Sequence, residues 1–128
     1  MKNTALGEHI LIELYDCDAN LLDDTAYLEE AFLEAAQKAH ATVVMSRFHH
    51  FSPIGVSGVV VVQESHLALH TWPEYAYAAV DIFTCSPTMN YQAAFEHLVE
   101  KLKAQTTDFQ RIERGKNLTP RPLSFSKS

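Results

Sequence analysis

The chain has 128 residues, a length that suits one domain built around a single hydrophobic core. Its hydrophobic fraction of 47% is that of a globular protein rather than a disordered one. The net charge of −6 argues against a protein that binds duplex nucleic acid, which would normally carry a basic face, and no basic amphipathic stretch suggests a membrane surface as a partner.

The first half of the chain predicts a strand, a helix and two further strands. Residues 8–17 alternate apolar and polar side chains, as a half-buried strand does. Residues 18–40 begin with Asp and Asn side chains that can cap a helix, and an apolar stripe with helical spacing follows. The stripe consists of Leu28, Phe32, Ala35 and Ala39. Strands are predicted at 41–51 and 56–63, on either side of the turn residues 52–55.

The second half predicts two strands, a helix and a last strand. The strands cover 66–72 and 75–85, with Pro73 between them, and the last strand covers 106–115. Residues 116–128 are rich in Ser, Pro, Lys and Arg, which predicts a mobile tail behind a single domain of residues 1–115. The apolar stripe of the helix consists of Tyr91, Phe95, Leu98 and Leu102.

Two helices among about six strands predict an α+β fold, a two-layer α/β sandwich in which an antiparallel sheet carries both helices on one face. The other face must then be polar or paired with another surface. The near-continuous apolar run at 59–62 favours pairing. We therefore expect a homodimer in which the sheets of two copies pack together.

The cysteine content and the N-terminus bear on the cellular compartment. Cys17 and Cys85 are the two cysteines, too few for a disulfide framework. Glu8, His9 and Glu13 interrupt any signal-peptide core, and the apolar runs are too short to span a bilayer. We expect a cytoplasmic protein with reduced thiols.

The most unusual stretch is VVVVQESHLALHTWPE, residues 59–74, in which an apolar strand leads into reactive side chains. Ser65 and His70 could serve as nucleophile and base, and Cys85 adds a thiol, as covalent catalysis requires. Regular alternation places Ser65 and His70 on opposite faces of the strand. The two could cooperate only if the backbone departs from strand geometry near residue 64.

Residues 48–85, FHHFSPIGVSGVVVVQESHLALHTWPEYAYAAVDIFTC, resemble the core of the prokaryotic S-adenosylmethionine decarboxylases, small pyruvoyl-dependent enzymes of polyamine synthesis. GVSG, ESHLALHTWPE and AAVDIFTC occur in the family's order and spacing. HILIELYDCD, LLDD and AFEHL extend the resemblance over nearly the whole chain, as far as Gly115. It implies a proenzyme that cuts itself between Glu64 and Ser65 into a β chain, 1–64, and an α chain, 65–128.

The resemblance also implies how the cut proceeds. The Ser65 hydroxyl attacks the Glu64 carbonyl and converts the amide into an ester. β-Elimination then releases a chain that ends at Glu64, and the dehydroalanine left behind hydrolyses to the pyruvoyl cofactor. His70 resembles the base that removes the α-proton, and Ser57 of GVSG resembles the serine that supports processing by hydrogen bonding. Without the family, Ser57 would be interpreted as a small residue in a glycine-rich turn.

The implied reaction is the decarboxylation of S-adenosylmethionine through a Schiff base on the pyruvoyl group derived from Ser65, which supplies the aminopropyl donor for spermidine. Cys85 resembles the family's proton donor, although a lone cysteine at a strand end is more often a buried apolar thiol. Phe51 and Trp72 match aromatic positions around the adenine and could attract the sulfonium by cation–π contact worth ~0.5–2 kcal/mol. Glu74 matches the acidic residue that binds the ribose hydroxyls.

The family further implies active sites at the interface of the homodimer, with residues from both protomers. Two positions depart from its pattern: Ala76 and Ser86 stand where many relatives have glycine, and both residue types resist a positive φ. Neither replacement removes a group that the chemistry needs.

Three alternatives stay open at this point. A pyruvoyl-dependent decarboxylase of arginine or ornithine would share the cleavage machinery, but Phe51, Trp72 and Glu74 favour the nucleoside substrate. A processing-dead relative is disfavoured because the reactive residues are all present. A metal-binding structural module could use zinc ligands, but strand geometry does not bring them together, and we expect no metal. Those ligands would be His49, His50, His66, His70 and Cys85.

Overall fold

The structure is a computed structural model that describes residues 5–63 and 65–124. Its elements follow in the order β1 (Ala5–Tyr15), η1 (Leu21–Asp23), α1 (Thr25–Lys38), β2 (Val43–His50), β3 (Val56–Val62), β4 (Ser65–Trp72), η2 (Pro73–Tyr75), β5 (Tyr77–Thr84), α2 (Tyr91–Leu102) and β6 (Thr106–Lys116), where η1 and η2 are short 3-10 turns.

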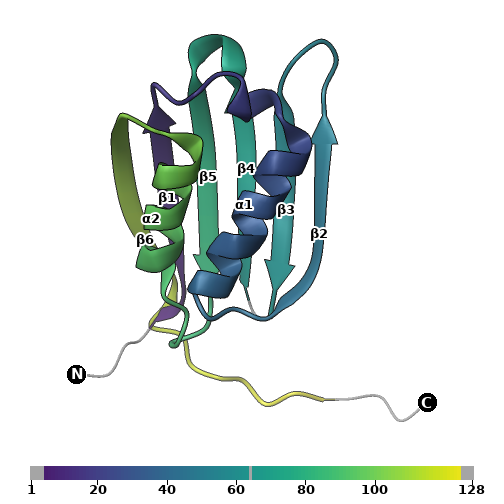
Figure 1. The fold of residues 1–128 in the computed structure, drawn as a ribbon. Coiled ribbons are helices and arrows are strands. Elements are labelled where there is room, and N and C mark those ends of the chain that lie inside the picture. The colour runs from purple at the N-terminus through teal and green to yellow at the C-terminus, as the bar shows by residue number, and fades with distance from the viewer. Residues whose placement is uncertain (1–4, 64, 125–128) are drawn as a thin grey trace.

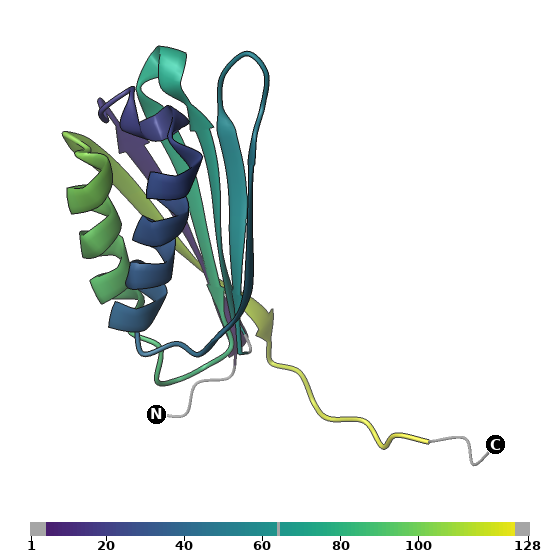
Figure 2. The ribbon, with the colours of Figure 1, turned by 45° about the vertical axis from the view of Figure 1, so that its right-hand side comes forward.

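The described strands form one antiparallel six-stranded sheet in the order β2-β3-β4-β5-β1-β6. Both helices lie side by side on one face of the sheet (Figure 1), and the opposite face carries no helix among the described residues (Figure 2). The predicted α+β sandwich is confirmed. The proposed reactive residues lie on β3, β4 and the segments that follow β4 and β5, in the middle of this sheet.

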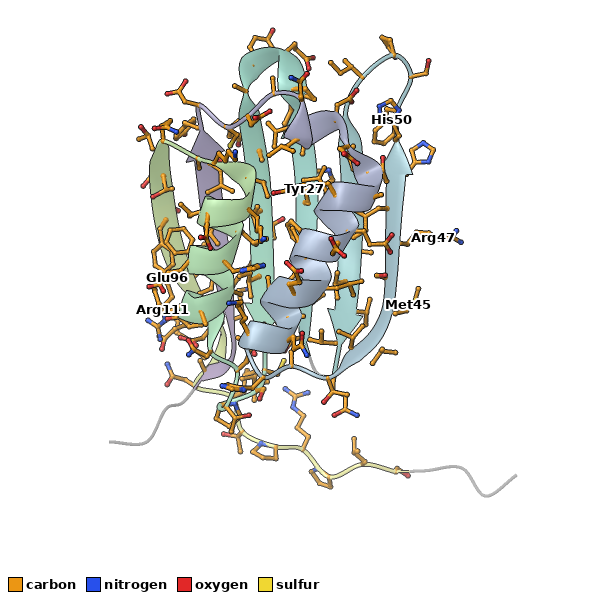
Figure 3. The ribbon with its side chains drawn as sticks, in the orientation of Figure 1. Tyr27, Met45, Arg47, His50, Glu96 and Arg111 are labelled. Atoms are coloured by element: carbon orange, nitrogen blue, oxygen red, sulfur yellow. The ribbon has the colours of Figure 1, made fainter. Side chains whose placement is uncertain are left out.

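The core lies between the helices and the sheet, because one face of each strand and one stripe of each helix are apolar. In α1 the predicted stripe is fully buried, and Asp24 caps the helix by accepting a hydrogen bond from the backbone N–H of Tyr27. The Tyr27 hydroxyl donates to the carbonyl of Lys101 at 2.8 Å and joins α1 to α2 (Figure 3). The stripe of α2 is only partly as predicted, since Ala94 and His97 are buried while Tyr91 and Phe95 pack half-buried beside β6.

Several predicted boundaries move. Strand β1 begins at Ala5 and ends at Tyr15 rather than covering 8–17, and β4 includes Ser65. The prediction that a strand begins at residue 75 was wrong by two residues, because Pro73–Tyr75 form η2 and Ala76 follows in the left-handed conformation with φ 53°. The last strand runs one residue further than predicted, to Lys116, and residues 117–124 form no helix or strand.

The face without helices, here called the open face, collects every second residue of the strands. On β4 it carries His66, Ala68, His70 and Trp72, which are exposed or half-buried, whereas the residues between them are buried. Val59 and Val61 of β3 add apolar surface next to them. This pattern suits a surface that pairs with another, and packing of two sheets stays a prediction. No helix among the described residues is long and apolar enough to cross a membrane.

Candidate active site

Ser65 is the first residue of β4 and lies at one end of the sheet. Antiparallel pairing places it opposite Thr84, the last residue of β5. The Ser65 side chain is 8% exposed on the helix-covered side, and its hydroxyl donates a hydrogen bond of 3.0 Å to Thr84 Oγ1. Cys85 follows β5 directly and is exposed, so it is not the buried apolar thiol that is common at strand ends. The serine and this thiol therefore belong to the same end of the sheet.

A polar cavity of about 220 Å³ adjoins Ser65. Its lining includes Gln63, Ser65, Ser86 and Thr88, whose hydroxyl and amide groups can hold water by hydrogen bonding. A serine that is converted through dehydroalanine to a pyruvoyl group needs a confined hydroxyl for the first step and access to water for the final hydrolysis. Residue 65 has both, so the chain's own groups fit a pyruvoyl precursor here. Glu64, the other side of the predicted cut, lies outside the described residues.

Ser57 and His70 meet at the opposite end of the same strands. They are direct cross-strand partners on β3 and β4, and Ser57 Oγ lies 2.8 Å from His70 Nδ1 in a hydrogen bond. Within the described residues His70 Nε2 makes no hydrogen bond, so it is the ring nitrogen left free to contact a reacting group. The structure thus brings together the two residues that the resemblance links to processing.

The predicted binding residues gather around this pair. A cavity of about 220 Å³ is lined by Phe51, Trp72 and Glu74 together with Ser57 and His70. The rings of Phe51 and Trp72 are 47% and 41% exposed, which leaves apolar surface open for a planar ligand. An exposed carboxylate at Glu74 adds a hydrogen-bond acceptor on the same rim.

Trp72 is supported from behind by an aromatic neighbour that sequence reasoning did not single out. Its ring stacks on Tyr77 at a centroid distance of 5.4 Å, and Tyr77 donates a hydrogen bond to the Glu13 carboxylate. Burial first, and then this bond to Glu13, raises the pKa of Tyr77 above its usual range. The phenol therefore stays protonated and holds its place beside Trp72.

The backbone and the packing explain why both positions of GVSG that carry glycine, 55 and 58, require it. Gly55 has φ 112°, a conformation that side chains strongly resist, and it ends the turn that carries Phe51. At Gly58 a Cβ atom would lie 2.2 Å from Cδ2 of Phe48, so only glycine leaves room for that ring. The turn is tied down by Asp23, which accepts hydrogen bonds of 2.8 Å from the Gly55 N–H and from His50 Nε2.

The two groups of residues are well separated within one chain. Five residues at about 3.3 Å each place Ser65 and His70 about 17 Å apart along β4. They also point to opposite faces, because β4 keeps regular alternation from Ser65 onward. Proton transfer requires heavy atoms within about 3.2 Å, or one intervening water. His70 therefore cannot serve Ser65 of its own chain in this structure.

Comparison with known proteins identifies the family. The family model described as S-adenosylmethionine decarboxylase matches residues 8–115. The chain belongs to the S-adenosylmethionine decarboxylase family. A protein named S-adenosylmethionine decarboxylase proenzyme from Pseudomonas paraeruginosa strain PA7 is 52% identical over 112 residues, which make up 88% of this chain and 70% of that protein. One of the same name from Thermotoga maritima is 49% identical and is covered to 86%, again with 88% of this chain.

The fold of this S-adenosylmethionine decarboxylase family member also matches a solved structure. The adenosylmethionine decarboxylase from Aquifex aeolicus VF5 superposes with a TM-score of 0.80 and 33% sequence identity, over 92% of this chain and 99% of that one. The resemblance inferred from GVSG, ESH and FTC is therefore confirmed at the level of the family. The roles of single residues are a separate matter and stay predictions.

The two departures from the family pattern behave differently. Ala76 takes the left-handed conformation that its relatives' glycine would adopt more easily, and its backbone N–H donates to the Pro73 carbonyl. Ser86 is not among the described residues with positive φ, and its backbone N–H donates to Thr84 Oγ1 at 3.0 Å. The positive φ that alanine and serine resist is thus present at residue 76, and residue 86 is not among the positive-φ residues of the described part of the chain.

The two thiols differ in chemistry. Burial, and secondarily the charge of Asp16, raises the pKa of Cys17 to about 11, so this buried thiol stays protonated and inert at neutral pH. Cys85 is exposed and directly follows Thr84, the strand partner of Ser65. Residues 5–63 and 65–124 contain no group of three or more His, Cys, Asp and Glu side chains that could hold a metal ion. His66 and His70, on one face of β4, lie about 13 Å apart.

Proposed function

We propose that the chain cleaves itself between Glu64 and Ser65 and then decarboxylates S-adenosylmethionine. The observation that carries the proposal is the division of the family's motif residues into two built sites. One holds a buried serine hydroxyl at the end of the sheet where the exposed Cys85 follows β5, and the other holds a hydrogen-bonded Ser57–His70 pair beside an aromatic cavity. The first site suits making and using a reactive carbonyl, and the second suits proton transfer and binding of a nucleoside.

Self-cleavage needs Ser65 as nucleophile and a base for the elimination that follows. His70 is suited to be that base in the tautomer whose Nδ1–H donates to Ser57 Oγ, because Nε2 then has a free lone pair for the α-proton of residue 65. The Ser57 hydroxyl fixes the ring by accepting this bond, and its own proton stays available to be donated to developing negative charge. The cavity next to Ser65 supplies water for the hydrolysis that completes maturation.

A pyruvoyl group at residue 65 supplies an electron sink that eases the departure of a carboxylate from an α-amino acid. The chain's own residues then have two tasks. Cys85 lies next to Thr84, the partner of residue 65, and is suited to return a proton to the carbon that loses CO2. Trp72 and Phe51 offer ring faces to the adenine and to the sulfonium, and Glu74 accepts hydrogen bonds from the ribose hydroxyls. Decarboxylated product would serve as the aminopropyl donor for spermidine.

A homodimer completes the site in this proposal. Because Ser65 and His70 of one chain lie about 17 Å apart, each Ser65 must be served by His70 of a second copy. The open face, with its uncovered apolar residues on β3 and β4, is the surface available for that copy. Two unpaired cysteines among the described residues fit a reducing cytoplasm as the setting.

The decisive experiment measures the intact mass of the purified protein under denaturing conditions, with Ser65→Ala as the uncut control. Two fragments that meet between Glu64 and Ser65, the second without a free α-amine, establish self-cleavage. Release of CO2 from S-adenosylmethionine, compared with arginine and ornithine, then identifies the substrate. A wild-type chain that stays whole after long incubation, or one that is cut but acts only on arginine or ornithine, contradicts the proposal.

A further inference from the structure

We propose that Thr84 is a positioning residue for self-cleavage, which holds the Ser65 hydroxyl so that its oxygen lone pairs are free to attack the Glu64 carbonyl. The inference rests on the proposed function and deepens it. Thr84 lies within the FTC stretch that carries the resemblance, which gives it no role, and its role is inferred from the pairing of β4 with β5.

Thr84 is held from three directions. It is 3% exposed and lies opposite Ser65 in the sheet. Its hydroxyl oxygen accepts hydrogen bonds from the Ser65 hydroxyl at 3.0 Å and from the backbone N–H of Ser86 at 3.0 Å. Its own proton is donated to the Ser86 carbonyl at 3.3 Å. All the hydrogen-bonding capacity of this hydroxyl is therefore committed.

This arrangement fixes the direction of the bond to Ser65. The Ser86 carbonyl can only accept, so its bond with Thr84 uses the Thr84 proton, which then does not point at Ser65. Ser65 is then the donor, and its proton is directed at Thr84. The lone pairs of Ser65 Oγ are left for another electron-poor centre, and the bond increases electron density on that oxygen. If Ser65 accepted a hydrogen bond from Thr84 instead, one lone pair of its oxygen would be engaged and less available for attack.

The step that Thr84 assists balances within the chain. A bond forms from Ser65 Oγ to the carbonyl carbon of Glu64, and the bond from that carbon to the Ser65 nitrogen breaks. The proton of the hydroxyl ends on this nitrogen, which becomes an amine. No oxidant or other reactant is needed. Thr84 fixes the side-chain rotamer of the nucleophile in the confined space where small misplacement is costly, on the order of 100-fold in rate for about 1 Å.

The test compares Thr84→Val, which has no hydroxyl, with Thr84→Ser, which keeps one, by following the intact mass from synthesis onward. Hydroxylamine added to samples reports the ester, because it cleaves the ester between Glu64 and Ser65 and yields a Glu64 hydroxamate and a free amine at Ser65. Ser46→Ala is the matched control, since it removes a hydroxyl that bonds Glu29 at 2.6 Å on the same side of the sheet but far from residue 65. Thermal unfolding monitors folding of each variant, with Thr84→Ala as a smaller hydroxyl-free variant.

We expect the hydroxyl-free variants to be cut on the order of 10- to 100-fold more slowly, without accumulation of the ester, and Thr84→Ser and Ser46→Ala to be cut like wild type. Cleavage at the wild-type rate or faster in Thr84→Ala would overturn the inference. So would slow cleavage with abundant ester, because Thr84 would then act after the attack. A wild-type chain that is never cut contradicts the proposed function itself, whereas a cut wild type with unaffected Thr84 variants contradicts only this inference.

Discussion

The sharpest prediction concerns which chain supplies His70 to which Ser65. We consider two variants, Ser65→Ala and His70→Ala, each of which cannot be cut alone. The first keeps a base but has no nucleophile, and the second keeps a nucleophile but has no base. Along β4 the two positions lie about 17 Å apart and on opposite faces, against the roughly 3 Å that proton transfer requires. If a second copy provides the base, a mixed dimer contains one complete site and one site that lacks both groups.

The expected extent of cleavage follows from random pairing. When the two variants are co-expressed in equal amounts, about half of the dimers are mixed and about half of the His70→Ala chains lie in them. Up to half of the His70→Ala chains should therefore be cut, and no Ser65→Ala chain should be. Tags of different mass on the two variants allow both fractions to be read by intact-mass measurement. The CO2 released from S-adenosylmethionine should rise with the fraction of cut chains.

Two outcomes would refute this reasoning. Absence of cleavage in proven mixed dimers would mean that Ser65 and His70 act within one chain, which requires a rearrangement of β4. Cleavage of His70→Ala alone would mean that His70 is not the base. Co-expression of His70→Ala with a chain that carries both substitutions is the control, because its mixed dimers contain no complete site and should stay uncut.

Three further predictions follow from local structure. Ala76→Gly should raise the free energy of unfolding by about 0.5–1 kcal/mol and Tm by roughly 2–4 °C, because the left-handed backbone costs alanine more than glycine; an unchanged or lower Tm in calorimetry would contradict this. Iodoacetamide at neutral pH should modify the exposed Cys85 quickly and abolish decarboxylation, while Cys17, with its pKa near 11, reacts only after unfolding. Peptide mapping identifies the modified cysteine, and early labelling of Cys17 would show that Cys17 is not the inert thiol. Asp23→Asn should lower the free energy of unfolding above about pH 4 and lose this effect in more acidic solution, because the hydrogen bond from the Gly55 N–H lowers the pKa of the folded carboxyl below its unfolded value of about 3.9. Urea titrations of wild type and variant measure the difference in unfolding free energy at pH 6 and at pH 2.5. Equal differences at the two pH values would rule this out.

The fold was predictable because apolar side chains recur along the sequence with the regular spacing of strands and helices. Alternation at 8–17 and the stripe from Leu28 to Ala39 each have one dominant explanation, and the structure has a strand and a helix there. The predicted stripe of α2 missed His97, which is buried and forms a hydrogen bond of 2.9 Å with Glu34. A titratable residue that is buried by a partner on another helix gives no apolar signal in the sequence.

The site was predictable in its members but not in its arrangement. A strand that began at Tyr75 would leave a two-residue link after Trp72, and this register would pair Ser65 with Ile82. The 3-10 turn and the left-handed Ala76 lengthen the link by two residues and bring Thr84 opposite Ser65 instead. Turn conformation depends on backbone angles that alanine rarely adopts, so the sequence argued against the geometry that places the nucleophile's partner.

The layout of β4 also indicates where a symmetry axis would have to lie. If two open faces pack with their β4 strands antiparallel, a two-fold axis between Leu67 and Ala68 would bring Ser65 of each copy level with His70 of the other. Packed sheets lie about 10 Å apart, a gap that facing side chains fill. Near this axis the open face carries Ala68 and Val59, which are small enough for close approach, whereas the larger reactive and aromatic side chains lie towards the ends of the strand. An interface of this kind would create two identical sites from one strand, in each of which His70 of one copy approaches the backbone of residue 65 of the other from the open face, while the Ser65 side chain stays on the helix-covered side.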